Sequence, residues 1–353
     1  MNRRLPATII TGFLGSGKTT LIRKLLLNSG RKLAVIVNEF GLVGIDGDLI
    51  KSCGFCLEEE IEGRIIELNN GCLCCTVQDD FLPAIEKILS NSKNLDGVVI
   101  ETSGLALPKP LVKALEWPEI RTNIFVNGVI SVVDGEALSQ GSPVIDFKSV
   151  EEQRSNDKNI EHQTSIEDLF SNQIKASDIV LISKVDKIDS IKLEKVKNHI
   201  KPYLRNGAQY FSIVNGLIDY ELILDSYYSE QENLSLSGLK NTKHEHEDEH
   251  KHEHLEAFTK SIRMEIDLTR EWIEKKLPSL CIKFNIIRLK GRIWLTNKKI
   301  PLQVQMVGPR INTWFESVPE SAWQPDKSGI DLVVISLEEI SLDKLLEDIK
   351  RYS

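Results

Sequence analysis

A glycine-rich segment near the start of the chain has the spacing of a phosphate-binding loop. Gly12-x4-Gly17-Lys18-Thr19 follows a β-branched run at 7–11, and leucines then recur at helical spacing. A strand, a glycine loop and a helix in this order form a P-loop, because successive backbone N–H groups point at an anion. We expect Lys18 to reach the β- and γ-phosphates and the Thr19 hydroxyl to bind Mg²⁺. The residues predicted to bind a nucleoside triphosphate are Gly12, Gly15, Ser16, Gly17, Lys18, Thr19 and Thr20.

Two acids follow the next predicted strand, which covers residues 32–38. Glu39 comes directly after it, and Asp46 lies in the glycine-containing stretch that follows. Ligands of open α/β sheets bind at the carboxyl ends of parallel strands. These acids are therefore placed to meet the nucleotide, its magnesium or another metal, with ordinary solvated loop acids as the alternative.

A third predicted strand, at 96–100, leads into Glu101-Thr-Ser-Gly104. In P-loop enzymes an acid at this strand end holds the magnesium shell, and a nearby glycine donates its N–H to the γ-phosphate. Glu101 and Gly104 fit these two roles. With Lys18 they make up the predicted catalytic set.

The identity of the nucleobase is indicated by the motif Ser183-Lys184-Val185-Asp186. This motif begins at the end of the apolar run 179–183, which is a predicted strand and follows another predicted strand at 129–133. GTPases carry Asn, Ser or Thr followed by Lys-x-Asp here. The Asp accepts from guanine N1 and N2, and the Lys stem covers the ring. Four residues alone are a weak match, but their position after a P-loop and in the right strand order makes it strong. Asp186 should select guanine, and Ser183 in place of asparagine should give a weaker contact.

Five of the six cysteines fall between positions 53 and 75. Cys53 and Cys56 form a C-x-x-C, and Cys72, Cys74 and Cys75 form a C-x-C-C. Thiolates favour soft or borderline divalent ions such as Zn²⁺ or Co²⁺. The spacing is not that of a standard zinc finger, so structural zinc, a functional metal site and inert buried thiols all stay open at this point.

Composition describes an ordinary protein of two domains. The chain has 353 residues, 41% of them hydrophobic and 27% charged, and a net charge of −8. The negative charge argues against nucleic acid or an acidic membrane as a partner. No apolar run approaches the ~20 residues of a membrane-spanning helix, and the N-terminus does not resemble a signal peptide. We therefore expect a cytoplasmic location, where clustered thiols are metal ligands more often than disulfides.

A polar linker divides the chain. We place a P-loop α/β domain with a mostly parallel sheet at 1–229, the linker at 230–256 and a smaller α+β domain at 257–353. Within the linker, residues 244–254 hold five histidines and five acids in eleven residues, a composition that cannot bury a core. Imidazoles at this density bind first-row metals with little selectivity, so the tract either buffers metal or simply solubilises the linker. The isolated Cys281 is expected to be a core thiol.

Taken together, the sequence resembles the CobW family of metal-handling P-loop GTPases over nearly the whole chain, most closely its cobalamin-biosynthesis branch. The matching segments are Thr11–Thr20, Asn38–Gly41, Gly71–Cys75, Asp79–Phe81, Glu101–Lys113 and Arg288–Trp294. The resemblance implies a Mg²⁺-dependent GTPase that binds a divalent metal at Cys72, Cys74 and Cys75 and delivers it to a client protein. Cobalt, a corrin-ring pathway and a client such as a cobaltochelatase are implied for that branch.

Three alternatives stay open at this point. A zinc-handling GTPase of the same family is one, because intrinsic ligand affinities favour Zn²⁺ over Co²⁺. A small-molecule kinase shares the P-loop but should lack the Ser183–Asp186 motif. A metal-storage protein with a vestigial P-loop would not need the intact Gly17, Lys18 and Thr19.

Overall fold

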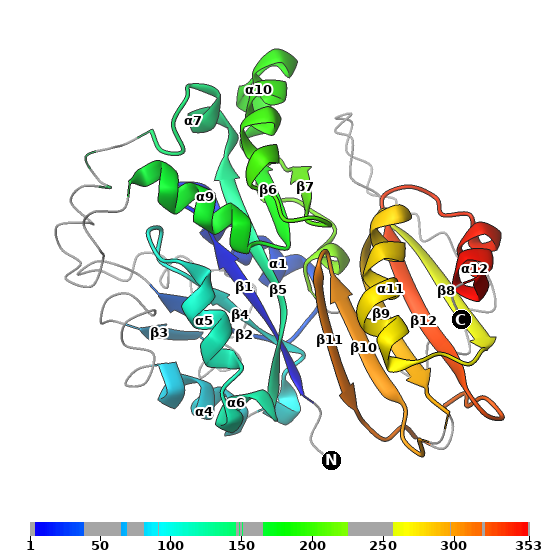
Figure 1. Cartoon of the computed structure of the whole chain (residues 1–353). Coiled ribbons are helices and arrows are strands. Elements are labelled where there is room, and N and C mark those ends of the chain that lie inside the picture. The colour runs from blue at the N-terminus through cyan, green and yellow to red at the C-terminus, as the bar shows by residue number, and fades with distance from the viewer. Residues whose placement is uncertain are drawn as a thin grey trace. The chain divides into compact units, whose positions relative to one another are not determined.

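The structure, a computed structural model, describes residues 4–38, 65–68, 81–90, 92–145, 148, 150, 165–224, 257–296, 298–319 and 322–351. The chain forms two compact units (Figure 1). The first comprises Met1–Leu224 together with Gln305–Asn312, and the second comprises Asp225–Val304 and Thr313–Ser353. No helix among the described residues is long and apolar enough to cross a membrane.

The first unit is built on a seven-stranded sheet in the order β3-β2-β4-β1-β5-β6-β7, and all its neighbours pair in parallel. Its continuous apolar runs explain why β1, β4, β5 and β6 are buried along their whole length. The mostly parallel sheet predicted from the sequence is confirmed. The strands are β1 (Leu5–Thr11), β2 (Leu33–Asn38), β3 (Ile65–Leu68), β4 (Gly97–Glu101), β5 (Ile124–Asp134), β6 (Ile179–Ser183) and β7 (Gln209–Ser212).

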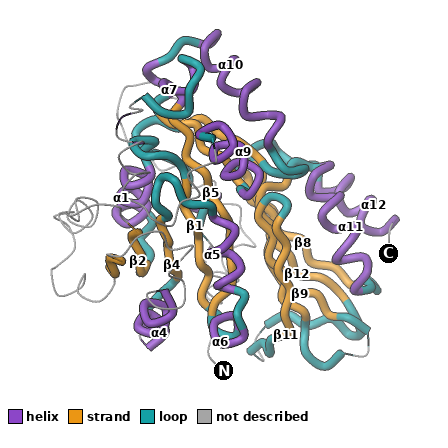
Figure 2. Tube along the Cα trace, turned by 60° about the vertical axis from the view of Figure 1, so that its left-hand side comes forward, coloured by secondary structure: helices purple, strands orange, loops and turns teal. Residues whose placement is uncertain are grey.

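Helices cover both faces of this sheet (Figure 2). Their starts follow local capping rules: the Ser165 side chain accepts from the Asp168 N–H, Asp189 accepts from Lys192, and proline opens α5 and α6. The helices are α1 (Lys18–Asn28), α4 (Leu82–Ser90), α5 (Pro108–Leu115), α6 (Pro118–Arg121), α7 (Gly135–Ser139), α9 (Ile166–Ala176) and α10 (Ser190–Ile200). Short 3₁₀ turns are η2 (Ser92–Asn94), η3 (Val185–Lys187), η4 (Lys201–Tyr203) and η5 (Tyr220–Leu222).

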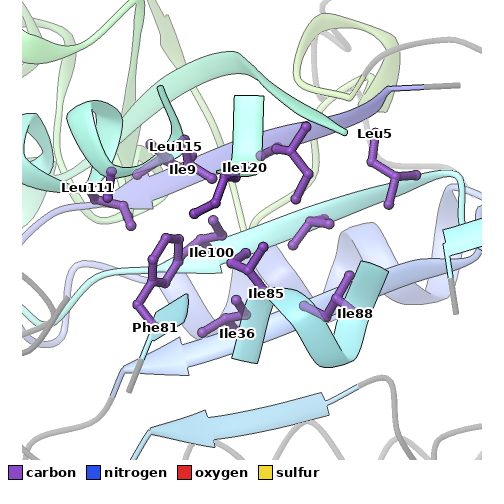
Figure 3. Close-up of a cluster of buried hydrophobic side chains, with 14 of the residues drawn as sticks. Leu5, Ile9, Ile36, Phe81, Ile85, Ile88, Ile100, Leu111, Leu115 and Ile120 are labelled. Carbon is purple, nitrogen blue, oxygen red and sulfur yellow. The ribbon is translucent and has the colours of Figure 1, made fainter. Parts of the chain in front are cut away.

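Two apolar clusters fasten these helices to the sheet. In the cluster of Figure 3, Phe81 and Ile85 of the α4 region pack over Ile36 and Ile100 of the strands, and all four are fully buried. A second cluster joins α9 and α10 to β5 and β6 around Phe170. Burial of aliphatic and aromatic side chains contributes roughly 1.5–3 kcal/mol each, so the helices in these two clusters are held firmly against the sheet.

A five-stranded sheet has the order β11-β10-β9-β12-β8, with β12 antiparallel to both β8 and β9. Strands β8, β9 and β12 belong to the second unit, whereas residues 305–312 of β10 and β11 belong to the first. The predicted α+β character is confirmed. Helix α11 continues through Pro278, and Leu280 and Cys281 extend its buried face beyond this residue. The elements of this C-terminal part of the chain are β8 (Phe258–Glu265), α11 (Arg270–Lys283), β9 (Ile286–Trp294), β10 (Leu302–Val307), β11 (Arg310–Phe315), β12 (Gly329–Ser336) and α12 (Leu342–Arg351).

Cys281 lies in this core as expected. Its side chain is 1% exposed, and burial raises the pKa of its thiol. A thiol that stays protonated is a poor metal ligand, so Cys281 serves packing.

A fully buried carboxylate, Asp178, precedes β6 in the first unit. One of its oxygens accepts from the Val129 N–H at 2.8 Å and from Arg310 Nε at 2.7 Å, and the other is paired with Arg205. Burial lowers the pKa of the Arg205 guanidinium. The carboxylate thus fixes the start of the strand that carries the predicted base-binding motif.

Replacing Asp178 with alanine should destabilise the protein strongly, because two arginines and a backbone N–H would lose their shared acceptor. Breaking such a buried pair costs about 3–5 kcal/mol. Urea unfolding of Asp178→Ala tests this. Glu194→Ala, which removes an exposed partner of Lys197, is the matched control and should leave the midpoint unchanged.

Candidate functional site

The P-loop connects the end of β1 to the start of α1. Gly12, Gly15 and Gly17 adopt positive φ angles of 133°, 73° and 103°, which side-chain-bearing residues rarely adopt. A Cβ atom on Gly12 would lie 2.1 Å from the Val132 carbonyl oxygen. The backbone therefore approaches its neighbouring strand too closely for any other residue at position 12.

Lys18 and Glu101 meet beneath this loop. The Lys18 ammonium lies 3.9 Å from a Glu101 carboxylate oxygen and donates to the Phe13 carbonyl at 3.2 Å. Both side chains are buried, at 7% and 4% exposure. Strand register explains the meeting, because Glu101 pairs with Ile10 at the end of β1. The structure thus brings together two of the three residues predicted to be catalytic.

The third, Gly104, lies against the P-loop. A Cβ atom at this position would be 2.7 Å from the Leu14 backbone nitrogen, so the two backbones touch without a side chain between them. The preceding Thr102 is fixed to β1, since its N–H donates to Ile10 and its hydroxyl to Thr11, both at 3.0 Å. The Glu101–Gly104 segment is therefore held directly beside the predicted phosphate site.

The hydroxyl groups of the loop differ in environment. Ser16 is buried, and its Oγ has no hydrogen-bond partner within the described part of the chain. Thr19 is half-buried in the first turn of α1, and Thr20 is exposed. A threonine hydroxyl at the start of this helix is the oxygen donor that Mg²⁺ takes from a P-loop.

The motif predicted to bind the base begins at the end of β6. The Ser183 hydroxyl lies 2.6 Å from the Ser16 carbonyl and 3.1 Å from the Val133 carbonyl, so it ties this strand end to the P-loop. Lys184 adopts a left-handed backbone conformation, with φ of 55°. Asp186 follows, exposed, in the turn η3. The phosphate loop and the base-binding motif thus share one edge of the sheet.

Asp134 belongs to the same site, although the sequence suggested only a strand end there. One carboxylate oxygen accepts from the Ala137 N–H at 3.0 Å and caps α7, while the other lies 2.5 Å from the Lys184 ammonium. The sequence signal at this position was the glycine that follows it, Gly135. The structure shows why glycine is needed there, because a Cβ atom would lie 2.7 Å from the Ser183 carbonyl oxygen. Asp134 thereby fixes the lysine of the base-binding motif.

Several predicted site residues lie outside the described residues. These are Glu39, Asp46, the cysteines at 53, 56, 72, 74 and 75, and the histidine tract 244–254. Among the residues that the structure does describe, no group of three or more Cys, His, Asp or Glu side chains could hold a metal ion.

Comparison with known proteins agrees with this geometry. Residues 6–211 match the CobW/HypB/UreG nucleotide-binding domain, and residues 257–350 match the cobalamin synthesis protein cobW C-terminal domain. The chain belongs to the CobW family. It is therefore a P-loop GTPase from a family of metallochaperones.

Curated relatives share most of the chain. The zinc chaperone CobW of Pseudomonas aeruginosa is 39% identical over 95% of this chain and 88% of its own, and that of Sinorhizobium sp. is 37% identical over 96% and 94%. The zinc-regulated GTPase metalloprotein activator 1 of Schizosaccharomyces pombe is 34% identical over 56% of this chain and 43% of its own. Among solved structures, Zn(II)-bound YjiA GTPase from E. coli aligns over 99% of both chains at 17% identity and a TM-score of 0.36.

The contact between Asp134 and Lys184 predicts how the nucleobase is held. Asp134→Asn keeps an oxygen for the α7 cap but removes the charge that fixes Lys184. If the lysine stem covers the purine ring, affinity for GTP, GDP and ITP should fall together, by about tenfold for a loss of roughly 1.4 kcal/mol. The GTP to ITP ratio should not change, because the exocyclic amino group is assigned to Asp186.

Fluorescence titrations with the three nucleotides measure this effect. Glu136→Gln is the matched control, since it removes a neighbouring carboxylate that pairs with Lys187 at 3.2 Å in a more exposed position. Unchanged affinity in Asp134→Asn would mean that Lys184 needs no such support.

Proposed function

We propose that this GTPase couples the binding and hydrolysis of Mg·GTP to the transfer of a divalent metal ion, held by Cys72, Cys74 and Cys75, to a client protein. The observation that carries the proposal is the parallel register of three strands. Leu68, the last residue of β3, pairs with Asn38, and the preceding residue of β2, Val37, pairs with Glu101. The ends of β3, β2 and β4 are therefore level.

This register supports a link between the cysteines and the nucleotide site. The chain leaves β3 at the edge of the sheet where Glu101 and the P-loop lie, and Cys72 comes four positions after Leu68. Strand β2 ends at the same edge, and Glu39 is the next residue in the sequence. Segments that leave the sheet here are the ones that a γ-phosphate and its metal order in other GTPases. Ordering them would bring the three thiols together, and hydrolysis would release them.

The nucleotide site supports specific roles. The backbone of Gly12–Gly17 and the Lys18 ammonium bind phosphates, with the Gly104 N–H directed to the γ-phosphate. Thr19 and Glu101 offer the hydroxyl and carboxylate oxygens that Mg²⁺ prefers, and Mg²⁺ supplies charge neutralisation during phosphoryl transfer. Lys184 and Asp186 bind guanine. Glu39 and Asp46 remain candidates for oxygen ligands to either metal.

We favour Zn²⁺ as the cargo. Two of the relatives are named zinc chaperones and a third is named zinc-regulated, and thiolate sites bind Zn²⁺ more tightly than Co²⁺. The names of these relatives give the expected cobalt no support. The match of residues 257–350 to a domain named for cobalamin synthesis keeps Co²⁺, with a corrin-metallating client, as the second candidate.

Guanine selection by Asp186 is directly testable. Asp186→Ala should lower affinity for GTP and leave weak ATP binding unchanged, because only guanine offers the N1 and N2 donors that the carboxylate accepts. Competition of GTP and ATP against a fluorescent nucleotide gives the ratio. Asp189→Ala, which removes an exposed acid that caps α10, serves as the control. An unchanged ratio in Asp186→Ala would show that another group reads the base.

Metal and nucleotide should bind cooperatively. Zn²⁺ affinity should rise with a non-hydrolysable GTP analogue and not with GDP, by linkage of on the order of 1–3 kcal/mol. Because the ligands are thiolates, uptake should release protons and weaken as pH falls. Cys74→Ser should abolish the coupling and leave GTP binding intact.

Competition with a chromophoric chelator measures Zn²⁺ affinity in each nucleotide state, and thiolate-to-cobalt absorption reports Co²⁺ in the same way. Cys281→Ala removes a buried thiol of the second unit and is the matched control, expected to keep the coupling. Equal metal affinity with the GTP analogue and with GDP would contradict nucleotide-gated delivery.

A further inference from the structure

A buried glutamine on α9 contacts the segment that follows Glu101. Gln173 is 1% exposed, and its side-chain nitrogen lies 3.1 Å from the Gly104 carbonyl oxygen and 3.1 Å from that of Ala106. An amide group has two N–H donors, so each carbonyl can take one. Helix α9 lies beside β5 and α5, on the side of the sheet where this segment runs (Figures 1 and 2).

The contacted segment is a single turn. The Ala106 N–H donates to the Ser103 carbonyl at 3.1 Å, which closes Ser103–Ala106. No peptide bond among the described residues is cis, so the N–H of Gly104 points away from the Ser103 carbonyl of the same peptide plane. Fixing the turn therefore fixes the direction of the Gly104 N–H. Gln173 supplies this support by holding two carbonyls of the turn.

The turn is supported from opposite ends. Thr102 anchors its start to β1 through Ile10 and Thr11. Gln173 holds the Gly104 and Ala106 carbonyls of the turn, and its helix lies nearly seventy residues further along the chain. Gly104 has no side chain of its own to pack, and its backbone touches that of Leu14. Backbone hydrogen bonds must therefore set the position of this residue.

We propose that Gln173 is a positioning residue for the γ-phosphate step: it holds the Ser103–Ala106 turn so that the Gly104 N–H faces the terminal phosphate of GTP. The inference rests on the role proposed above for Gly104. GDP has no γ-phosphate, so its binding does not depend on this turn. Loss of the support should then affect GTP binding and hydrolysis selectively.

Gln173→Met tests the assignment, because methionine has a similar length and no donor. Affinity for GDP should stay within about twofold of the wild type. Affinity for a non-hydrolysable GTP analogue should fall about tenfold, the effect of roughly one charge-assisted hydrogen bond, and kcat for GTP hydrolysis should fall at least as far. Titration with fluorescent nucleotides and single-turnover hydrolysis give these values.

Ser177→Ala is the matched control for general destabilisation. Its hydroxyl donates to the Gln173 backbone carbonyl at 2.7 Å, and Ser177 is fully buried at the end of the same helix, with no side-chain hydrogen bond to the turn among the described residues. This variant should lose stability and keep the wild-type ratio of GTP to GDP affinity. An equal fall in the ratio of GTP to GDP affinity in Ser177→Ala and in Gln173→Met would overturn the proposal. An unchanged affinity ratio and an unchanged kcat in Gln173→Met would overturn it as well.

Lys18→Ala distinguishes a failure of the proposed phosphate site from a failure of the proposed role of Gln173. Loss of nucleotide binding in Lys18→Ala, combined with an unaffected Gln173→Met, would retain the GTPase site and reject only the role of Gln173. Retained binding and hydrolysis in Lys18→Ala would instead reject the phosphate site on which that role rests.

Discussion

The nucleotide site depends on backbones that approach each other with no side chains between them. The start of the P-loop lies so close to β5 that a Cβ on Gly12 would overlap the Val132 carbonyl, and Gly104 contacts the P-loop at Leu14 in the same way. These two contacts join β5, the P-loop and the segment after β4 into one layer. Phosphate recognition uses backbone N–H groups, which can converge only when the chain segments pack this closely.

This close packing of backbones is accompanied by buried charged side chains. Lys18, Glu101, Asp134 and Asp178 all lie near strand ends and are nearly inaccessible to solvent. Each has an oppositely charged or hydrogen-bonding neighbour, but replacing buried ion pairs with well-packed apolar groups is often neutral or stabilising. Their presence is better explained by position: the first three lie beside the segments predicted to bind phosphate and base. Asp178 differs, because its partners are two arginines and the Val129 backbone N–H, and its effect is structural.

The sequence was informative where function and fold depend on short local patterns. Ala7–Thr11 and Ile179–Ser183 are recognisable as buried strands because they are apolar throughout, and the Gly12–Thr19 spacing predicts the loop between strand and helix. Strand β3 was not predicted: it has four residues, and Glu67 interrupts its apolar pattern. Strand β7 carries polar residues at both ends, and its position at the sheet edge allows this.

Residues that act through tertiary contacts gave weaker signals. Asp134 could be seen only as a polar residue after a strand, since its contact with Lys184 spans fifty positions. Gln173 lies inside an amphipathic helix, where a single glutamine is an ordinary surface residue until the fold shows it to be buried. No local pattern distinguishes such a residue, because its partners are backbone carbonyls, which are the same for every amino acid.

One short segment of the chain makes several of these contacts. From Gln173 to Lys184, helix α9 runs into β6 with Asp178 between them, and this stretch touches three different loops. Gln173 holds the turn after β4, Ser183 holds the P-loop through the Ser16 carbonyl, and Lys184 is held by Asp134. A strand pinned at its start by a buried carboxylate cannot shift without moving all three contacts. The loops predicted to bind phosphate and base are therefore held by the same stretch of chain, and under the proposed function a change in the turn that faces the γ-phosphate would be passed to the guanine-binding motif through this stretch.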